Sequence, residues 1–385
     1  MKRSIVQIFA GVSMLFSSDL AFSQTTGQTI NVVTTAVPFL RISPDARAGG
    51  MGDLGIATSP DANSQFYNVA KYAFAEQPSG IGFTYTPWLK DLGLNDVYLA
   101  SLAGYYQLDE DQAISSSLRY FSLGNIQFTD NLGNDLNSFR PREFSFDAGY
   151  SRKLSDVLSL GVALRYINSN LAGGQAVNGV SYKAGNAVSG DIGLYYSSIG
   201  EDGSGLNLGL AMTNLGSKIS YTNDATQKDF IPANLGLGAL YTFTNNEVNQ
   251  LSFGLDIHKL MVPTPPALGD SAGLVNYRTK GIVSSWFSSF NDAPGGFAEE
   301  LKEFSFSLGS EFTYDNQFSV RAGYFYENQT KGNRQYFSMG AGFKYSSINM
   351  NLSYLIPSGS GVNRNPLSNT IRFSVLFDLS PAEGY

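Results

Sequence analysis

The chain has 385 residues, of which 43 % are hydrophobic and 13 % aromatic, and its formal net charge is −7. The absence of cysteine excludes disulfides, thiol nucleophiles and thiolate metal sites, and the single histidine, His258, leaves little room for a zinc site. The acidic balance argues against nucleic acid as a partner, and we expect neither a cofactor nor a bound metal.

The first 23 residues have the pattern of a secretory signal peptide. Two basic residues precede an apolar run from Ile5 to Phe16, and the small residues Ala21 and Ser23 stand just before Gln24. The alternative is a buried first helix. We predict that the mature protein starts near Gln24, outside the cytoplasm. Together with the barrel pattern described below, this indicates the outer membrane of a Gram-negative-type cell.

Residues 24–79 form a segment without the alternation that follows it. Its four closely spaced glycines fit neither glycine-rich nucleotide-binding template. Glycine lets backbones approach closely and permits positive φ, so we interpret the segment as a compact hatch inside a narrow lumen. Asp61 opens a predicted short, capped helix. The residues expected to pack the hatch into the lumen are Arg47, Gly49, Gly50, Gly52, Asp53 and Asn68.

Residues 80–379 alternate apolar and polar side chains with a period of two. Phe306 and Leu308, for example, fall on one face, and Ser305 and Ser307 on the other. Segments of about ten residues that are rich in Tyr and Phe are typical of an all-β, transmembrane antiparallel barrel. We predict about 14 strands, near 80–88, 96–107, 112–122, 142–154, 157–168, 187–199, 206–215, 231–243, 248–258, 303–314, 317–326, 337–346, 348–356 and 367–379.

The predicted connections alternate between short turns and mostly long loops. The pattern places the short turns in the periplasm and the long loops outside the cell, with both termini periplasmic. The short connections are 109–111, 155–156, 200–205, 245–247, 315–316 and 347, and the long ones are 123–141, 169–186, 216–230, 259–302, 328–336 and 357–366.

The same parity places most strand charges on the inward face. Charge is costly at mid-bilayer on the lipid face, so we expect these residues to pair with one another and with Arg41, Arg47 and Asp53 of the hatch. A polar solute path is the alternative. The inward set is Arg119, Asp147, Arg165, Asp191, Asp256, Glu311, Arg321, Arg372 and Asp378.

The longest predicted external loop, 259–302, contains an apolar cluster. Val262 and Pro263 begin a stiff, proline-rich stretch, and a short helix would place Trp286, Phe287 and Phe290 on one face. Such a cluster outside the cell marks a partner contact, a lid on the barrel mouth or contact with lipid. We predict that these five residues bind a partner.

His258 and Asp256 share the inward face near the external rim, so a catalytic dyad is conceivable. No local nucleophile motif accompanies the two residues. We therefore predict that the protein is not an enzyme.

The string from Phe39 to Asn68, FLRISPDARAGGMGDLGIATSPDANSQFYN, resembles the hatch of the PorV (LptO) family of FadL-like outer-membrane barrels. Val69 replaces the proline of the Asn-Pro-Ala motif that FadL-type hatches commonly carry. The resemblance is specific in the hatch and generic in the strands.

This resemblance implies an outer-membrane component of the type IX secretion system of Bacteroidetes. Such a protein binds the C-terminal β-sandwich signal domain of cargo at the translocon barrel and shuttles it to the surface sortase-like attachment complex. The alternative is a FadL-like channel for hydrophobic small molecules. The expected division is a signal peptide (1–23), a hatch (24–79), a barrel in outer-membrane lipid (80–379) and a tail (380–385).

Overall fold

The computed structural model describes residues 31–90, 93–129, 135–174, 176–177, 180–224, 227–245, 248–267, 269–357 and 369–379, which belong to one compact unit. The predicted signal peptide, its cleavage position and the tail lie outside these residues. Within the described ranges, no helix has the length and apolar character needed to cross a membrane.

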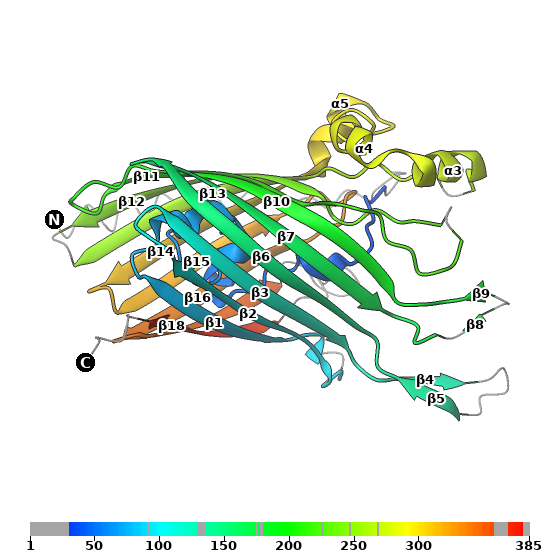
Figure 1. Cartoon of the computed structure of the whole chain (residues 1–385), viewed down its shortest axis with the longest axis horizontal. Helices are drawn as coiled ribbons and strands as arrows, with labels where there is room; N and C mark the ends of the chain where they lie inside the picture. The colour runs from blue at the N-terminus through cyan, green and yellow to red at the C-terminus, as the bar shows by residue number, and fades with distance from the viewer. Residues whose placement is uncertain are drawn as a thin grey trace, which may run out of the picture. The chain divides into compact units, whose positions relative to one another are not determined.

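Fourteen of the described strands form one closed antiparallel barrel (Figure 1). Each strand pairs with its neighbour along the chain, and β1 closes the ring by pairing with both β2 and β18. The strands are β1 (Ser79–Pro87), β2 (Val97–Gln107), β3 (Gln112–Leu123), β6 (Arg142–Ser155), β7 (Leu158–Asn170), β10 (Gly185–Ser197), β11 (Gly205–Gly216), β12 (Asn234–Asn245), β13 (Asn249–Leu260), β14 (Phe304–Tyr314), β15 (Phe318–Tyr326), β16 (Gln335–Tyr345), β17 (Ile348–Pro357) and β18 (Ile371–Leu379).

The predicted barrel is thus confirmed, with boundaries within a few residues of those expected. Two hairpins were not predicted: β4 (Ile126–Thr129) with β5 (Asp135–Phe139), and β8 (Ala176–Val177) with β9 (Val180–Ser181). Both lie inside predicted long loops, where their short strands carry too few residues for alternation to be recognised.

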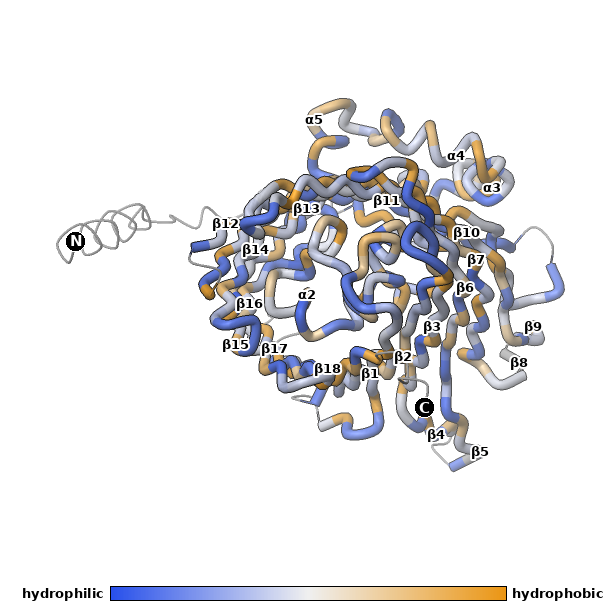
Figure 2. Tube along the Cα trace, turned by 60° about the vertical axis from the view of Figure 1, so that its left-hand side comes forward, coloured by the Kyte–Doolittle hydropathy of each residue, from blue (hydrophilic) through white to orange (hydrophobic). Residues whose placement is uncertain are grey.

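The outer face of the barrel is apolar and its inner face polar. On β14, Phe306 and Leu308 are 36 % and 58 % exposed, whereas Ser305 and Ser307 are buried. Hydrophobic and hydrophilic residues are accordingly mixed along each strand (Figure 2). A surface of this kind is stable when its outer face contacts lipid.

The N-terminal segment fills the lumen. It contains η1 (Pro38–Arg41), α2 (Ala46–Gly50), η2 (Ser64–Phe66) and η3 (Val69–Phe74), and Figure 2 shows α2 inside the ring of strands. The helix predicted after Asp61 is the 3-10 helix η2, whose N-cap residue makes no capping hydrogen bond. Local contacts replace that cap, since Asp61 Oδ1 accepts from the Asn63 amide at 2.9 Å.

The long loops lie at one end of the barrel, and the hatch enters from that end. The Asn31 amide donates to Thr330 O at 3.2 Å and the Ala36 amide to Phe230 O at 2.9 Å, and both acceptors belong to long loops. At the other end, Gln107 Nε2 donates to Ala75 O at 2.7 Å. The hatch therefore runs from the long-loop end to the short-turn end, where β1 starts. The sequence predicts the N-terminus on the short-turn side, whereas the described hatch begins, at Asn31, on the long-loop side.

Glycines bring the backbone of the hatch against the barrel wall. Gly52 has φ +71°, and a Cβ at this residue would lie 2.8 Å from the backbone of Tyr324. A Cβ at Gly323 would lie 2.1 Å from the Gly52 nitrogen. Only glycine fits at this contact, because a side chain at either residue would push the hatch from the wall.

We predict that Gly52→Ala destabilises the hatch by about 2 kcal/mol or more, through positive φ and the clash with Tyr324. The measurements are the temperature at which the purified barrel unfolds on a gel and the ion conductance of the reconstituted protein. Gly93→Ala is the matched control, because Gly93 has φ +78° with nothing within 4 Å of its Cβ position. Equal effects of the two substitutions would show that conformation alone, without the wall contact, matters at Gly52.

Candidate functional site

Ion pairs hold the hatch inside the barrel. Arg47 Nη2 lies 2.8 Å from Glu311 Oε1, and Arg321 Nε lies 2.5 Å from Glu311 Oε2. Arg372 Nη1 lies 2.6 Å from Asp53 Oδ1, and the Tyr336 hydroxyl donates to the other oxygen of Asp53. Pairing of inward charges with Arg47 and Asp53 is therefore confirmed, and it ties the hatch to strands β14, β16 and β18.

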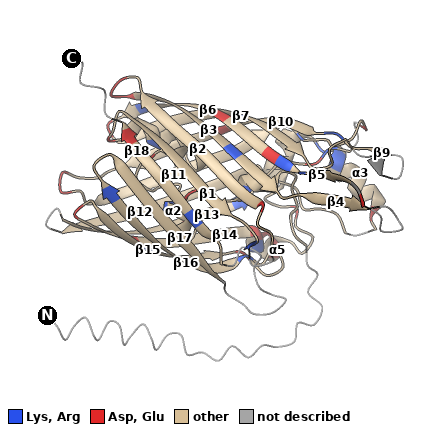
Figure 3. Ribbon diagram, turned by 90° about the horizontal axis from the view of Figure 1, so that it is seen from below, with Lys and Arg blue, Asp and Glu red and all other residues tan. Residues whose placement is uncertain are grey.

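Other inward charges pair within the wall or with hatch backbone. The buried Arg165 lies 2.6 Å from Asp147 and 2.8 Å from Asp191, and Figure 3 shows acidic and basic residues close together around β7 and β10. Asp256 Oδ2 accepts from the amides of Gly55 and Ile56 at 2.8 and 3.0 Å. Asp378 is half-buried at the short-turn end, where it pairs with Lys344 at 2.8 Å.

The other predicted hatch residues lie at contacts with the wall. Gly49 faces Arg372, and Gly50 faces the backbone of Gly340. Asn68 Nδ2 donates to Leu194 O at 2.9 Å while its Oδ1 accepts from the Ala70 amide. Asn68 thus caps η3 and binds the wall at the same time. It makes both contacts although the next residue is Val69 and not the proline of the Asn-Pro-Ala motif.

Sequence reasoning missed the hatch residue Lys71. Its side chain is fully buried, and Nζ donates to Gly55 O at 3.0 Å and Thr58 Oγ1 at 2.9 Å. Burial lowers the pKa of Lys71 to about 8. No sequence signal separates this lysine from a solvated one, because its partners are backbone and hydroxyl oxygens rather than a carboxylate at a recognisable spacing.

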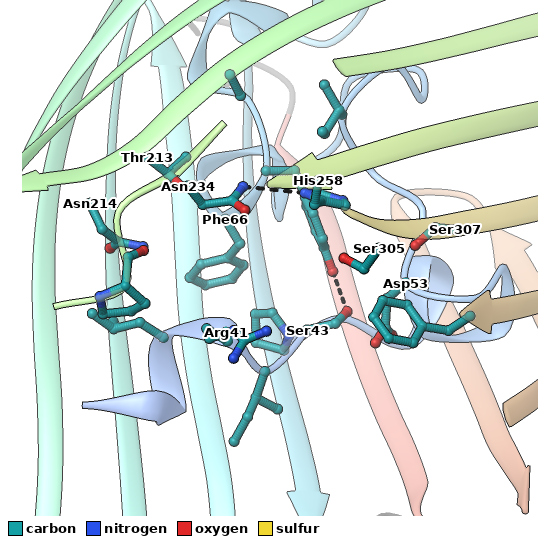
Figure 4. Close-up of a pocket in the computed structure, with 18 of the residues that line it drawn as sticks. Arg41, Ser43, Asp53, Phe66, Thr213, Asn214, Asn234, His258, Ser305 and Ser307 are labelled. Atoms are coloured by element: carbon teal, nitrogen blue, oxygen red, sulfur yellow. Dashed lines mark hydrogen bonds between the residues drawn. The ribbon is translucent and has the colours of Figure 1, made fainter. Parts of the chain in front are cut away.

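A cavity of about 120 Å³ lies between the hatch and the wall (Figure 4). His258 lines it, with Nδ1 3.3 Å from Asn234 Nδ2. Asp256 accepts its hydrogen bonds from two backbone amides of the hatch and not from His258. The conceivable His258–Asp256 dyad is therefore not formed in this structure.

Arg41 from the hatch also lines this cavity, near the external mouth. Its Nη2 lies 3.1 Å from Glu327, which also accepts two hydrogen bonds from Arg334. Arg41 therefore pairs with a carboxylate outside the predicted inward set, and its predicted pairing with a strand charge is wrong, because Glu327 lies just beyond the end of β15. Burial opposes ionisation of Glu327, but the two arginines outweigh it and hold the pKa of its carboxyl below its usual value.

The external loop after β13 is folded and anchored. It contains α3 (Ser271–Thr279), α4 (Ile282–Ser288), α5 (Phe297–Glu300) and η5 (Leu301–Glu303), and Figure 1 shows these helices beside the long-loop end of the barrel. The buried Lys259 lies 2.8 Å from Glu300 and 2.5 Å from Glu303. Lys331, from the loop after β15, lies 2.9 Å from Glu303. These pairs connect two external loops through one charge cluster.

The aromatic residues of this loop differ in exposure. The predicted short helix is present as α4, but it ends at Ser288, before Phe290; within it Phe287 is 75 % exposed and Trp286 is half-buried. Phe290 is 37 % exposed, and its ring lies 5.8 Å from the Lys259 ammonium. Sequence reasoning missed Phe297, which is 72 % exposed.

Val262 and Pro263 do not belong to the exposed surface. Both are buried, and Val262 packs against Val33 and Phe230. The prediction that they contact a partner is therefore corrected. They join the loop to the hatch entrance, because the proline-rich stretch runs inward to the barrel mouth before α3 begins.

We predict that Lys259→Met loosens the external loop, because it leaves the buried carboxylate of Glu300 without its cation and leaves Glu303 with Lys331 alone. Such a loss costs about 3–5 kcal/mol. Limited proteolysis of the folded barrel should show faster cleavage between residues 261 and 303. Lys302→Met is the control, since Lys302 makes no salt bridge with described residues. Unchanged cleavage in Lys259→Met would refute the anchoring role.

Comparison with known proteins places this geometry in context. The family model described as "Type IX secretion system protein PorV" matches residues 24–267. No curated protein matches the chain.

Solved structures with a similar fold include two toluene transporters. The Ralstonia pickettii transporter TbuX has 11 % identity and a TM-score of 0.52, and the alignment covers 86 % of this chain and 97 % of TbuX. The Pseudomonas putida transporter TodX has 15 % identity and a TM-score of 0.51, with 87 % and 98 % coverage. At these identities the likeness shows the fold alone, which is FadL-like.

Proposed function

The chain belongs to the PorV family of type IX secretion system proteins, and from this premise we propose that it binds the C-terminal signal domain of cargo at the translocon and shuttles it to the surface attachment complex. The coarser role, an outer-membrane barrel component of type IX secretion, follows from the family and the fold. The proposed partners are the translocon barrel, cargo with a C-terminal β-sandwich and the sortase-like complex.

A folded external loop with exposed aromatic side chains supports this proposal. Phe287 and Phe297 are mostly exposed, although the loop that carries them is held by buried ion pairs. A preorganised loop loses little conformational entropy on binding, and exposed aromatic residues are frequent anchors of protein interfaces. The proposed contact is Trp286, Phe287 and Phe290, with Phe297 added.

The membrane orientation belongs to the same proposal. We place the short turns and the C-terminal end of β18 in the periplasm and the long loops outside the cell. The division into signal peptide (1–23), hatch (24–79), barrel (80–379) and tail (380–385) is retained as a proposal, with β1 beginning at Ser79.

The alternative function is a channel for hydrophobic small molecules, since TbuX and TodX are toluene transporters with a similar fold. Two observations favour the shuttle. Hatch and wall share ion pairs and backbone contacts, and the lumen cavity of about 120 Å³ is lined by three arginines. Apolar ligands prefer larger and mostly hydrophobic pockets, and the larger pocket of the described structure, about 510 Å³, lies at the external mouth between residues 34–38 and 265–278, not along the lumen. We also propose that the protein has no enzymatic activity.

We predict that Phe287→Ser combined with Phe297→Ser weakens capture of a purified cargo signal domain about tenfold or more, because exposed aromatic anchors contribute on the order of 2 kcal/mol. Pull-down with the detergent-solubilised barrel measures capture, and surface display of cargo measures export. These substitutions test the contact more specifically than a deletion of residues 281–296. The deletion would also remove the hydrogen bond between Thr264 and Asp292 that anchors the loop.

Leu108→Ser is the control for that experiment, because Leu108 is 52 % exposed in a short turn at the opposite end. It should leave capture and export unchanged. Normal capture and export in the double variant would contradict the proposed contact. Uptake of long-chain hydrophobic compounds by vesicles that contain the barrel would support the channel instead.

A further inference from the structure

We propose that the lumen cavity beneath the external mouth binds a small oxyanion of the carboxylate, phosphate or sulfate class. Arg41, Arg119 and Arg334 line it together with His258, and Asp53 is the one carboxylate among its described lining residues. Figure 4 shows Arg41, Asp53 and His258 at this cavity. This inference is independent of the proposed partner contact, because it concerns the interior of the barrel and not the external helices.

Two of the three arginines share a single carboxylate. Arg334 donates two hydrogen bonds to Glu327, at 2.8 and 2.9 Å, and Arg41 donates one at 3.1 Å. Burial, with the nearby charge of Arg334, lowers the pKa of Arg41 to about 10. Two guanidinium groups that converge on one carboxylate leave positive charge beside the cavity.

Arg119 is buried without a carboxylate. Its side chain is 2 % exposed, Nη1 donates to Leu40 O at 3.2 Å, and the guanidinium lies 4.9 Å above the ring of Phe66. Within the described part of the chain it forms no salt bridge, and its Nε has no hydrogen-bond partner. A buried cation without a counter-charge is costly, so an anion in the cavity stabilises this arrangement.

The neighbouring acidic groups are already engaged. Asp53 is paired with Arg372, and Asp147 and Asp191 are paired with Arg165. Glu327 is shared by Arg41 and Arg334, so of the three arginines that line the cavity Arg119 has no carboxylate partner among the described residues.

Neutral donors complete the site. Ser307 is fully buried and its hydroxyl has no partner in the described structure. Figure 4 shows Ser305, Ser307, Asn234 and His258 around the same space as Arg41. Guanidinium and hydroxyl donors around one space suit the oxygens of a small anion.

The size of the cavity limits the ligand. Its 120 Å³ exceeds the roughly 30 Å³ that one water occupies in the liquid. It is well below the roughly 300–1,000 Å³ of pockets for drug-sized ligands. A small anion, or the head group of a larger one whose tail lies outside, fits these limits, whereas a whole lipid does not.

Titration calorimetry tests the proposal on the full barrel in a neutral detergent, at constant ionic strength in chloride. One arm adds inorganic phosphate or sulfate, and the other adds a short-chain phosphatidic acid. Saturable binding of the inorganic ions identifies a free anion as the ligand. Binding of phosphatidic acid alone identifies a lipid head group.

For whichever ligand binds the wild-type barrel, Arg119→Gln should weaken binding at least tenfold, because it removes one charge-assisted donor. Arg152→Gln is the control, since Arg152 is exposed on β6. Heat-modifiable migration on a gel confirms that each variant is folded; if Arg119→Gln does not fold, Ser307→Ala tests the same site and should weaken binding severalfold. Absence of binding in both arms, or equal binding by the folded cavity variant and wild type, would overturn the proposal.

Discussion

The direct contact between the hatch backbone and the barrel wall is the constraint on which the rest of this structure depends. Fourteen strands enclose a lumen that side chains of the wall alone do not fill. The hatch fills it because its glycines lie directly against glycines of the wall: Gly52 against Gly323, and Gly50 against Gly340. With no side chain between them, the two backbones come close enough for charged side chains nearby to reach across.

The ion pairs follow from this close approach. Arg47 with Glu311 and Asp53 with Arg372 join residues more than 260 positions apart in the chain. Each is buried or nearly so, and loss of one partner would leave the other charge in a poorly solvated place. Hatch and wall are therefore mutually dependent, which explains why charges that would be costly on the lipid face are retained inside.

The same interactions extend to the external surface. Glu327 joins Arg41 of the hatch to Arg334 of a long loop, and Lys331 of that loop joins Glu303 at the end of the helical loop. Val33 and Val262 pack together at the hatch entrance. The loop that carries the exposed aromatic residues thus packs directly against the hatch. The external face therefore has a defined shape before any partner binds.

The sequence by itself determined the barrel, its strand boundaries to within a few residues and the face on which most strand charges lie. These properties depend on a period of two, and a lipid exterior enforces that period strictly, because one misplaced charge on the outer face is costly. The glycine-rich hatch was recognisable for a similar reason, since only close backbone packing explains so many glycines in so few residues.

Only the tertiary structure decided which charges meet and which aromatic residues are exposed. Parity shows that Arg119 and Arg165 both point inward, but not that Arg165 has two carboxylates and Arg119 none. Spacing grouped Val262 with Phe287, although one is buried and the other mostly exposed. Pairing and burial arise from contacts between segments far apart in the chain, and a local pattern carries no information about them.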